Sequence, residues 1–144
     1  MCRRGYVALV TVGNTPNTDI LCSNKAGSRF VHLQVKTFVP GTKTCSVGVK
    51  AETDFGPTFF WVLAGIPAPG STAPFEYVII PAAEMANNVA EYHKRWLATP
   101  GQKGQPRLDS GVRAVAVALG APSYFWSVEA YRDRWELLGR ELDA

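Results

Sequence analysis

The sequence contains only three cysteines, Cys2, Cys22 and Cys45, and no Cys-x-x-Cys pair. An odd count without that spacing argues against a disulfide framework and a cysteine-rich zinc site, and it favours a reducing, cytoplasmic environment. Long apolar runs are also missing, because no stretch reaches the roughly 18 apolar residues of a membrane span. The apolar run 6–12 follows two arginines, as in a signal peptide. It lacks an A-x-A cleavage site, and its valine and threonine content favours a β-strand.

Several catalytic signatures are absent as well. The sequence has no GxxxxGK[ST], GxGxxG, HExxH or GxSxG motif, which argues against nucleotide-dependent, metalloprotease and esterase chemistry. The charge excess is small, with 15 basic against 12 acidic residues and a net charge of +3. This balance is compatible with a nucleic-acid partner but does not indicate one. A length of 144 residues with 47% hydrophobic residues predicts a single domain over 1–144.

Apolar periodicity predicts most of the strands. We expect strands at 6–12, 19–22, 29–38, 58–64 and 75–80, with a short extended piece at 46–50. The strand 29–38 alternates with period two, so its residues divide between two faces of a sheet. One face carries Val31, Leu33, Val35 and Thr37, and the other carries Phe30, His32, Gln34, Lys36 and Phe38.

Helical spacing appears only after residue 81. A helix is expected over 82–96, a short one over 112–119 that Gly120 closes, and a last one that Ser127 caps. The apolar stripe of the last helix consists of Val128, Tyr131, Trp135, Leu138 and Leu142. This order of elements predicts an α/β fold with a central mixed β-sheet flanked by helices. The core would span about 5–97, followed by a C-terminal helical region at about 108–142.

Asp19 begins the second predicted strand, and a polar loop of six residues joins that strand to 29–38. The two strands would be neighbours, so that Asp19 lies near Gln34 and Lys36. A carboxylate and an amide oxygen are hard ligands suited to Mg²⁺ or Mn²⁺, and the carbonyl of Val35 could add a third. Lys36 would orient or deprotonate an attacking water, or stabilise a phosphate in the transition state.

A Gln-x-Lys pair by itself has no specificity, since any amphipathic edge strand can carry both residues on its wet face. The order of features is more informative. A strand that starts at an aspartate, a polar hairpin loop, and an alternating strand that ends in Gln-Val-Lys-Thr form a much rarer combination.

The segment NTDILCSNKAGSRFVHLQVKT resembles the PD-(D/E)xK, or restriction-endonuclease-like, nuclease superfamily, in the subgroup with glutamine in place of the second acid. The later FFWVLAG, FEYVIIPAAEM and YHKRWL segments resemble small uncharacterised bacterial proteins of that subgroup. The resemblance covers roughly 3–97. It implies a restriction-endonuclease-like fold, Asp19 and Gln34 as metal ligands, Lys36 as the catalytic lysine, and metal-dependent cleavage of DNA.

The chain departs from that family at two places. Gln34 is neutral and removes a charge from the metal site. Family members also begin with a helix that carries a glutamate and ends near a Gly-Tyr pair, whereas here the pair is Gly5-Tyr6. We therefore expect this N-terminal helix to be missing. The uncovered sheet would favour a homodimer, or another element in the place of the helix.

Two functional hypotheses follow, an active nuclease and a catalytically inactive nuclease-like scaffold that binds nucleic acid or protein. A third is an unrelated α/β domain in which the hairpin is only structural. The candidate phosphate-binding residues are scattered along the chain and are Lys43, Lys50, Lys94, Arg95, Lys103, Arg107 and Arg113. His32 shares the face of Gln34, and both a site-lining and a packing role stay open. For His93 a solvated helix end is favoured over phosphate contact, and for Glu52 a solvated loop position is the more usual one.

Overall fold

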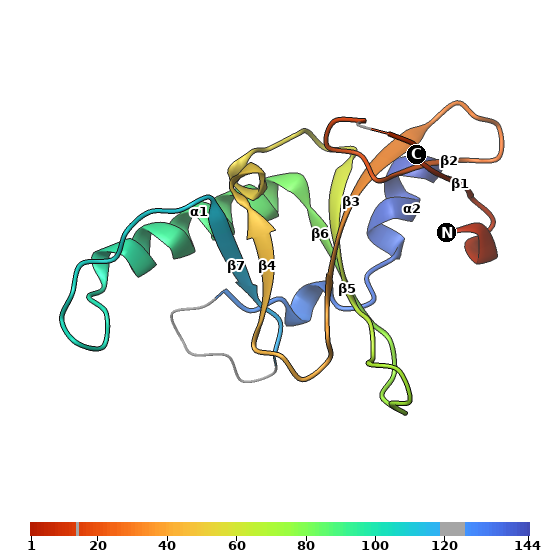
Figure 1. Cartoon of the computed structure of the whole chain (residues 1–144). Helices are drawn as coiled ribbons and strands as arrows, with labels where there is room; N and C mark the ends of the chain where they lie inside the picture. Colours follow the sequence, from red (N-terminus) through yellow and green to blue (C-terminus); the bar gives the residue numbers. More distant parts are fainter. Residues whose placement is uncertain (14, 119–125) are drawn as a thin grey trace.

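A mixed sheet of five strands forms the centre of the fold (Figure 1). The computed structural model describes residues 1–13, 15–118 and 126–144. The sheet has the order β1-β2-β3-β5-β6 and is made of β1 (Val7–Val10), β2 (Ile20–Ser23), β3 (Phe30–Phe38), β5 (Phe59–Gly65) and β6 (Glu76–Pro81). Only β3 and β5 are parallel, and the other neighbours are antiparallel. The predicted α/β class with a mixed sheet is confirmed.

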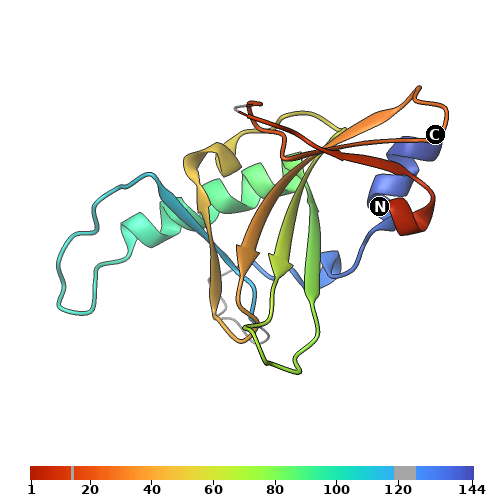
Figure 2. The ribbon, with the colours of Figure 1, turned by 45° about the vertical axis from the view of Figure 1, so that its right-hand side comes forward.

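A second layer covers one face of β5 and β6. It consists of a two-stranded antiparallel sheet, a short 3-10 helix and the long helix, namely β4 (Thr44–Gly48), β7 (Val112–Ala116), η2 (Val49–Glu52) and α1 (Ala82–Ala98). The first hydrophobic core lies between the layers and includes Trp61, Leu63, Val47, Met85 and Val115. Figure 2 shows β3, β5 and β6 side by side with α1 behind them.

Every residue of β5 is buried, as the continuous apolar run predicted. Its odd-numbered side chains enter the first core. Its even-numbered ones enter a second core on the other face, which includes Cys22, Val31, Leu33, Phe60, Leu138 and Leu142. A strand that is buried on both faces shows no alternation in the sequence.

The predicted helix over 112–119 is wrong, because Val112–Ala116 forms strand β7. This strand pairs antiparallel with β4 and places Arg113 and Val115 inward. Its valines are β-branched and suit a pleated surface, and the free edge of β4 supplies the ladder of backbone hydrogen bonds. Gly120, which we expected to end that helix, lies outside the described residues.

The last predicted helix is broken in two. It consists of η3 (Glu129–Tyr131) and α2 (Glu136–Asp143). Between them Arg132 bridges to Val78 of β6, and Asp133 donates its backbone N–H to the carbonyl of Tyr77. Val128 packs in the first core and Leu138 in the second. The segment therefore passes around the edge of β6 from one face of the sheet to the other, which one straight helix cannot do.

Helix α2 covers the face of the sheet that we expected to be bare. Leu138 and Leu142 are fully buried there against β3, and Tyr6 donates a hydrogen bond of 2.5 Å to Asp143. Residues Cys2–Arg4 form a single 3-10 turn, η1, beside it. The C-terminal helix thus lies next to the Gly-Tyr pair and covers this face of the sheet. The homodimer stays a prediction.

The described part of the chain contains no helix with the length and apolarity needed to cross a bilayer. Cys22 and Cys45 are buried free thiols, whereas Cys2 is exposed. Burial raises the pKa of Cys45 to about 11, although the charge of nearby Lys36 opposes the shift, and burial also raises the pKa of Cys22. Both buried thiols are therefore protonated and unreactive near neutral pH.

We expect iodoacetamide at pH 8 to alkylate Cys2 alone in the folded protein. The reagent attacks thiolates, and neither buried sulfur forms one or meets solvent under these conditions. Intact-mass spectrometry would show one added group, and three after unfolding in guanidinium. Rapid labelling of Cys45 in the native state would contradict the packing of β4 against the sheet.

Candidate functional site

Asp19 lies in a bend just before β2. Its backbone N–H donates to the carbonyl of Leu33 on β3 at 2.9 Å, while its own carbonyl accepts from the N–H of Thr11 at 2.9 Å. In a regular antiparallel strand both groups of one residue face the same neighbour. The chain is therefore kinked at Asp19, as in a β-bulge, and such kinks redirect a side chain.

The redirected carboxylate reaches across to β3. Its Oδ2 accepts the backbone N–H of Val35 at 2.7 Å and a short hydrogen bond from the side-chain amide of Gln34. Since β2 leaves β3 at this point, the N–H of Val35 has no strand partner there, and the carboxylate takes that place. The structure thus brings Asp19, Gln34 and Val35 together.

Lys36 follows Gln34 by two residues on β3, and so it shares that face of the sheet. It lies near Cys45 on β4. No ion pair of the described residues includes Lys36. Lys36 thus shares a face of β3 with Gln34, and Gln34 contacts Asp19. A catalytic set that includes Lys36 stays a prediction.

His32 lies one step before Gln34 on the same face. Its Nδ1 is 3.1 Å from the hydroxyl of Thr18, the residue before Asp19. This hydrogen bond explains the position of the ring without a ligand, and it also places an imidazole beside the candidate site. Both roles of His32 stay open.

The residues present can form a magnesium site with few charges. Mg²⁺ commonly binds one or two carboxylates and keeps several waters. Asp19 supplies the carboxylate, Gln34 an amide oxygen once its amide is rotated, and Val35 a carbonyl on the strand edge that its N–H already faces. The described residues contain no cluster of three His, Cys, Asp or Glu side chains suited to a metal.

Two buried polar atoms near this set were not identified from the sequence. The side-chain oxygen of Asn17 and the indole Nε1 of Trp61 have no hydrogen-bond partner among the described residues. Asn17 precedes Asp19 by two residues, and Trp61 is the partner of Gln34 in the β3–β5 register. Orphaned buried atoms mark places that a water or an ion can satisfy. No sequence pattern predicts these two atoms.

The structure does not gather the predicted phosphate-binding residues, and Arg113 is wrong as a member of the set because it is buried in an ion pair with Glu52. Lys43 and Lys50 flank β4, whereas Lys94 and Arg95 lie near the C-terminal end of α1. Figure 1 shows that this end of α1 extends away from the five-stranded sheet. Arg95 also forms an ion pair of 2.7 Å with Glu91. A surface that includes Asp19 can thus use Lys43 and Lys50 more readily than the residues of α1 and of the loop that follows it.

The distribution of charge is more informative than the total. Residues 1–50 contain seven lysines and arginines against one acid, Asp19, which is a net charge of +6. Residues 51–144 contain eight basic and eleven acidic residues, a net charge of −3. Charge asymmetry between parts of a chain is a signal for a polyanionic partner, and a count by segment would have found it in the sequence.

These cations are also not neutralised by ion pairs. The cationic partners in the ion pairs of the described residues are His93, Arg95, Arg113, Arg132 and Arg134. None of them comes from residues 1–50. Of the seven basic residues there, Arg4 stacks over the ring of Trp135 at 5.6 Å. No ion pair of the described residues therefore neutralises the positive charge of residues 1–50.

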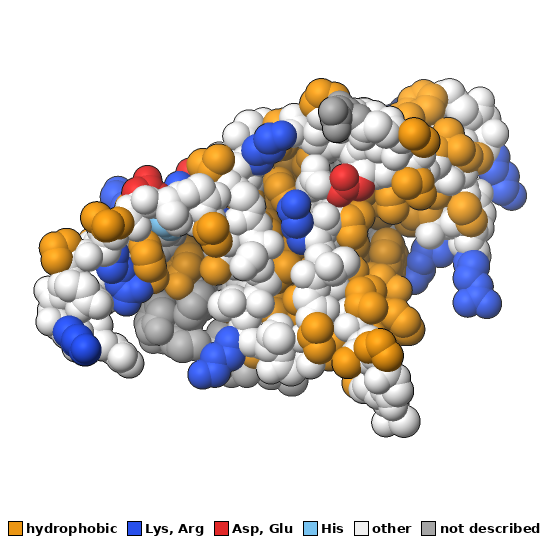
Figure 3. Space-filling view, in the orientation of Figure 1, with side chains coloured by type: hydrophobic (Ala, Val, Ile, Leu, Met, Phe, Trp, Pro, Cys, Tyr) orange, Lys and Arg blue, Asp and Glu red, His pale blue; other side chains and the backbone are white. Residues whose placement is uncertain are grey.

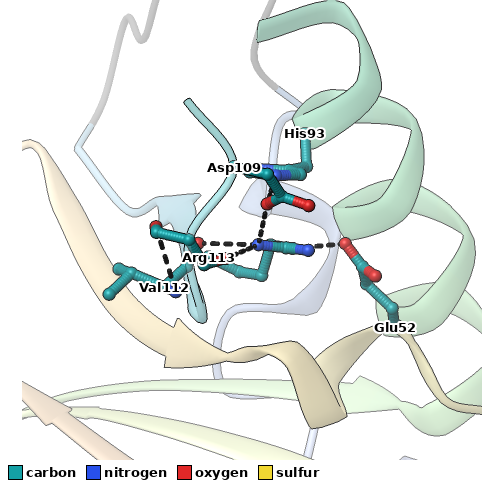
Figure 4. A network of polar contacts seen from close by, with 6 residues as sticks. Glu52, His93, Asp109, Val112 and Arg113 are labelled. Atoms are coloured by element: carbon teal, nitrogen blue, oxygen red, sulfur yellow. Dashed lines mark hydrogen bonds and ion pairs between the residues drawn. The ribbon is translucent and has the colours of Figure 1, made fainter. Parts of the chain in front are cut away.

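A second polar cluster joins η2, α1 and β7 (Figure 4). Arg113 is only 6% exposed and bonds to Glu52, to Asp109 at 3.2 Å and to the carbonyl of Val112 at 3.0 Å. His93 is buried and contacts Asp109 at 2.8 Å. This hydrogen bond lowers the pKa of Asp109.

Two expectations are corrected by this cluster. His93 is not a solvated helix end, and Glu52 is not a solvated loop carboxylate. His93 is enclosed because the connection between α1 and β7 folds back over α1, and its ring stacks on Trp96 with centroids 5.5 Å apart. Glu52 is partly buried and is paired with Arg113 of β7. The cluster satisfies its own charges and holds the second layer together, so we assign it to structure.

Comparisons of this chain with protein-family models, curated proteins and solved structures find no match. A functional assignment therefore depends on the geometry around Asp19 and on the excess of positive charge in residues 1–50.

Proposed function

We propose that this chain is a metal-dependent phosphodiesterase of the restriction-endonuclease-like type that cleaves DNA. The observation that carries the proposal is the position of Asp19. The only acid of residues 1–50 contacts Gln34 and Val35, on the strand that also bears Lys36. The resemblance of the Asp…Gln-Val-Lys segment to PD-(D/E)xK nucleases supports the same assignment. The mixed five-stranded sheet is compatible with a restriction-endonuclease-like fold.

Each residue of the set has a separate task in this proposal. Asp19, the amide oxygen of Gln34 and the carbonyl of Val35 would hold Mg²⁺ or Mn²⁺. When bound, the metal polarises the scissile phosphate and lowers the pKa of its water. Lys36 lies about 7 Å further along the strand than Gln34, since two residues of a strand rise that far. Its ammonium would orient the attacking water and stabilise negative charge on the phosphate.

A second candidate is a nuclease-like scaffold that binds nucleic acid or protein without cleaving. The observation that favours it is that Oδ2 of Asp19 already accepts two hydrogen bonds and completes the edge of β3. In that role the carboxylate needs no metal. The unpaired cations of residues 1–50 would still bind phosphates. A cytoplasmic location and a homodimer stay predictions under both candidates.

Nicking of supercoiled plasmid in Mg²⁺ or Mn²⁺ tests the first candidate. We expect Lys36→Ala to lower the cleavage rate by about 10²–10⁴-fold, the usual contribution of a positioned acid-base group. Lys103→Ala is the matched control, because Lys103 is an exposed lysine in the loop between α1 and β7. Equal cleavage by the wild type and Lys36→Ala would rule out the active site. Binding without any cleavage by the wild type would favour the scaffold.

A further inference from the structure

The two edges of the five-stranded sheet differ in how they are covered. Strand β6 forms one edge and β1 forms the other. The C-terminal segment covers the edge of β6 through the bridge between Arg132 and Val78. The edge of β1 has no such cover, since β2 is its only partner among the described strands. Unpaired N–H and C=O groups on an edge strand can pair with a further chain.

The ladder between β1 and β2 shows which backbone groups of β1 point outward. The N–H of Thr11 donates to the carbonyl of Asp19 at 2.9 Å, so these two residues form a hydrogen-bonded pair. Hydrogen-bonded and non-hydrogen-bonded pairs alternate along an antiparallel ladder. In the β1–β2 register the next hydrogen-bonded pair is therefore Leu9 with Leu21.

Ala8 and Val10 lie on either side of Leu9, and so both direct their N–H and C=O groups away from β2. No turn, loop or cap hydrogen bond between backbone groups of the described residues includes them. The segment 6–12 also lacks the charges and prolines that protect edge strands from pairing. Leu9 is 60% and Val10 76% exposed, and Figure 3 shows hydrophobic side chains where Figure 1 draws β1 and β2. This edge can therefore accept a further strand.

A second copy of the chain supplies a strand that fits this edge. When β1 is placed antiparallel to itself about Leu9, Ala8 stands opposite the partner's Val10, and each such pair exchanges two backbone hydrogen bonds. The side chains that meet are Leu9 with the partner's Leu9 and Val7 with the partner's Thr11. All of these pairs are uncharged and are apolar or β-branched, as in stable neighbouring strands.

The distribution of charge also suits a second copy in this arrangement. Arg4 and Lys25 lie with Tyr6 around one hollow at the beginning of β1. Antiparallel pairing places this end of one copy beside the far end of β1 in the other, where Asp19 bonds to Thr11. The cationic ends of the two copies are therefore kept apart, although residues 1–50 are basic as a whole.

We propose that two copies of this chain associate through β1 about a two-fold axis at Leu9, so that their sheets join into one. The axis is perpendicular to the sheet, and the β3 faces that carry Gln34 therefore lie on the same side of the dimer. Because β1 has only four residues, the contact is smaller than the roughly 1,600 Å² of a standard interface, and the dimer should dissociate on dilution. This pairing is independent of the chemistry at Asp19.

Sedimentation velocity over a dilution series tests the pairing, and we expect the wild type to change from dimer to monomer on dilution. Val10→Pro should weaken association about tenfold to a hundredfold, because each Ala8–Val10 pair loses one hydrogen bond. Proline is tolerated on an edge strand at a position whose N–H faces solvent. Val10→Thr is the matched control, since it keeps the N–H and the branched shape and should associate like the wild type.

A charge exchange at Leu9 tests the position of the axis. Leu9→Lys and Leu9→Glu should each be monomeric, because like charges would stand directly opposite each other. An equimolar mixture should form a dimer that contains one copy of each variant, and native mass spectrometry identifies it. Leu9 is 60% exposed in the single copy, so neither change removes core packing, and circular dichroism should match the wild type.

The remaining outcomes decide against the pairing. A wild type that stays monomeric at every concentration would overturn it. A dimer that Val10→Pro leaves intact, or that the mixture of Leu9 variants does not restore, would place the contact on another surface and would overturn it as well. None of these results decides the plasmid assay, because the side chains of Asp19 and Lys36 lie outside the paired edge.

Discussion

Replacement of Asp19 by alanine is expected to abolish metal-dependent cleavage and to lower the free energy of unfolding by about 1–3 kcal/mol. The first effect follows because Asp19 is the only charged ligand of the proposed metal site. The second follows because the N–H of Val35 and the amide of Gln34 lose their acceptor. A partly buried donor without a partner carries the penalty of desolvation. Plasmid nicking and urea denaturation measure the two effects separately.

Asp19→Asn separates the two roles of the side chain. Its amide oxygen can still accept the N–H of Val35, so we expect stability within about 1 kcal/mol of the wild type. The negative charge that attracts Mg²⁺ is lost, and cleavage and metal binding should disappear. Titration calorimetry with Mn²⁺ gives a readout that does not depend on cleavage. Full activity in Asp19→Asn would mean that this residue only completes the edge of β3.

Arg113→Ala is expected to lower the free energy of unfolding by about 2–4 kcal/mol. Removing one partner of a buried ion pair leaves the other charge uncompensated, which costs about 3–5 kcal/mol when both are fully buried. The smaller figure applies here because the side chain of Glu52 is 26% exposed and solvent screens part of its charge. Denaturation in urea at neutral pH measures the change.

The control for Arg113 is Arg95→Ala. Arg95 and Glu91 form a pair one helical turn apart on α1, with side chains 63% and 52% exposed. Such a pair contributes about 0.3–0.5 kcal/mol, so this variant should be nearly as stable as the wild type. Similar losses in the two variants would contradict the assignment of the cluster around Arg113 as the contact that holds η2, α1 and β7 together.

The uneven distribution of charge along the chain can be found by counting charges in segments of the sequence. The overall net charge of +3 conceals it, because the excess of acids after residue 50 cancels half of the positive charge before it. Only the structure shows which of the later arginines are already paired with carboxylates. Arg113 and Arg132 contact carboxylates of Glu52 and Glu76, so their charges are not available to a phosphate.

The sequence by itself determined the features that depend on neighbours along the chain. The period-two alternation of β3, the continuous apolar run of β5 and the helical spacing of α1 each reflect which face of one element is buried. The proximity of Asp19 and Gln34 also follows from local order, because a short loop joins their strands and the two residues are close in the hairpin register. Periodicity and short loops are local properties, and they are visible without the rest of the fold.

Tertiary structure decided what depends on partners far away in the chain. Val112–Ala116 became a strand because β4 offered a free edge, and that pairing outweighed the helical reading of the same residues. The C-terminal helix was interrupted because Val128 and Leu138 pack on opposite faces of the sheet. The kink at Asp19, which turns its carboxylate onto Val35, likewise arises from simultaneous bonds to β1 and β3. Such bonds join segments whose pairing no local pattern encodes, and they determine where the chemistry of this chain can take place.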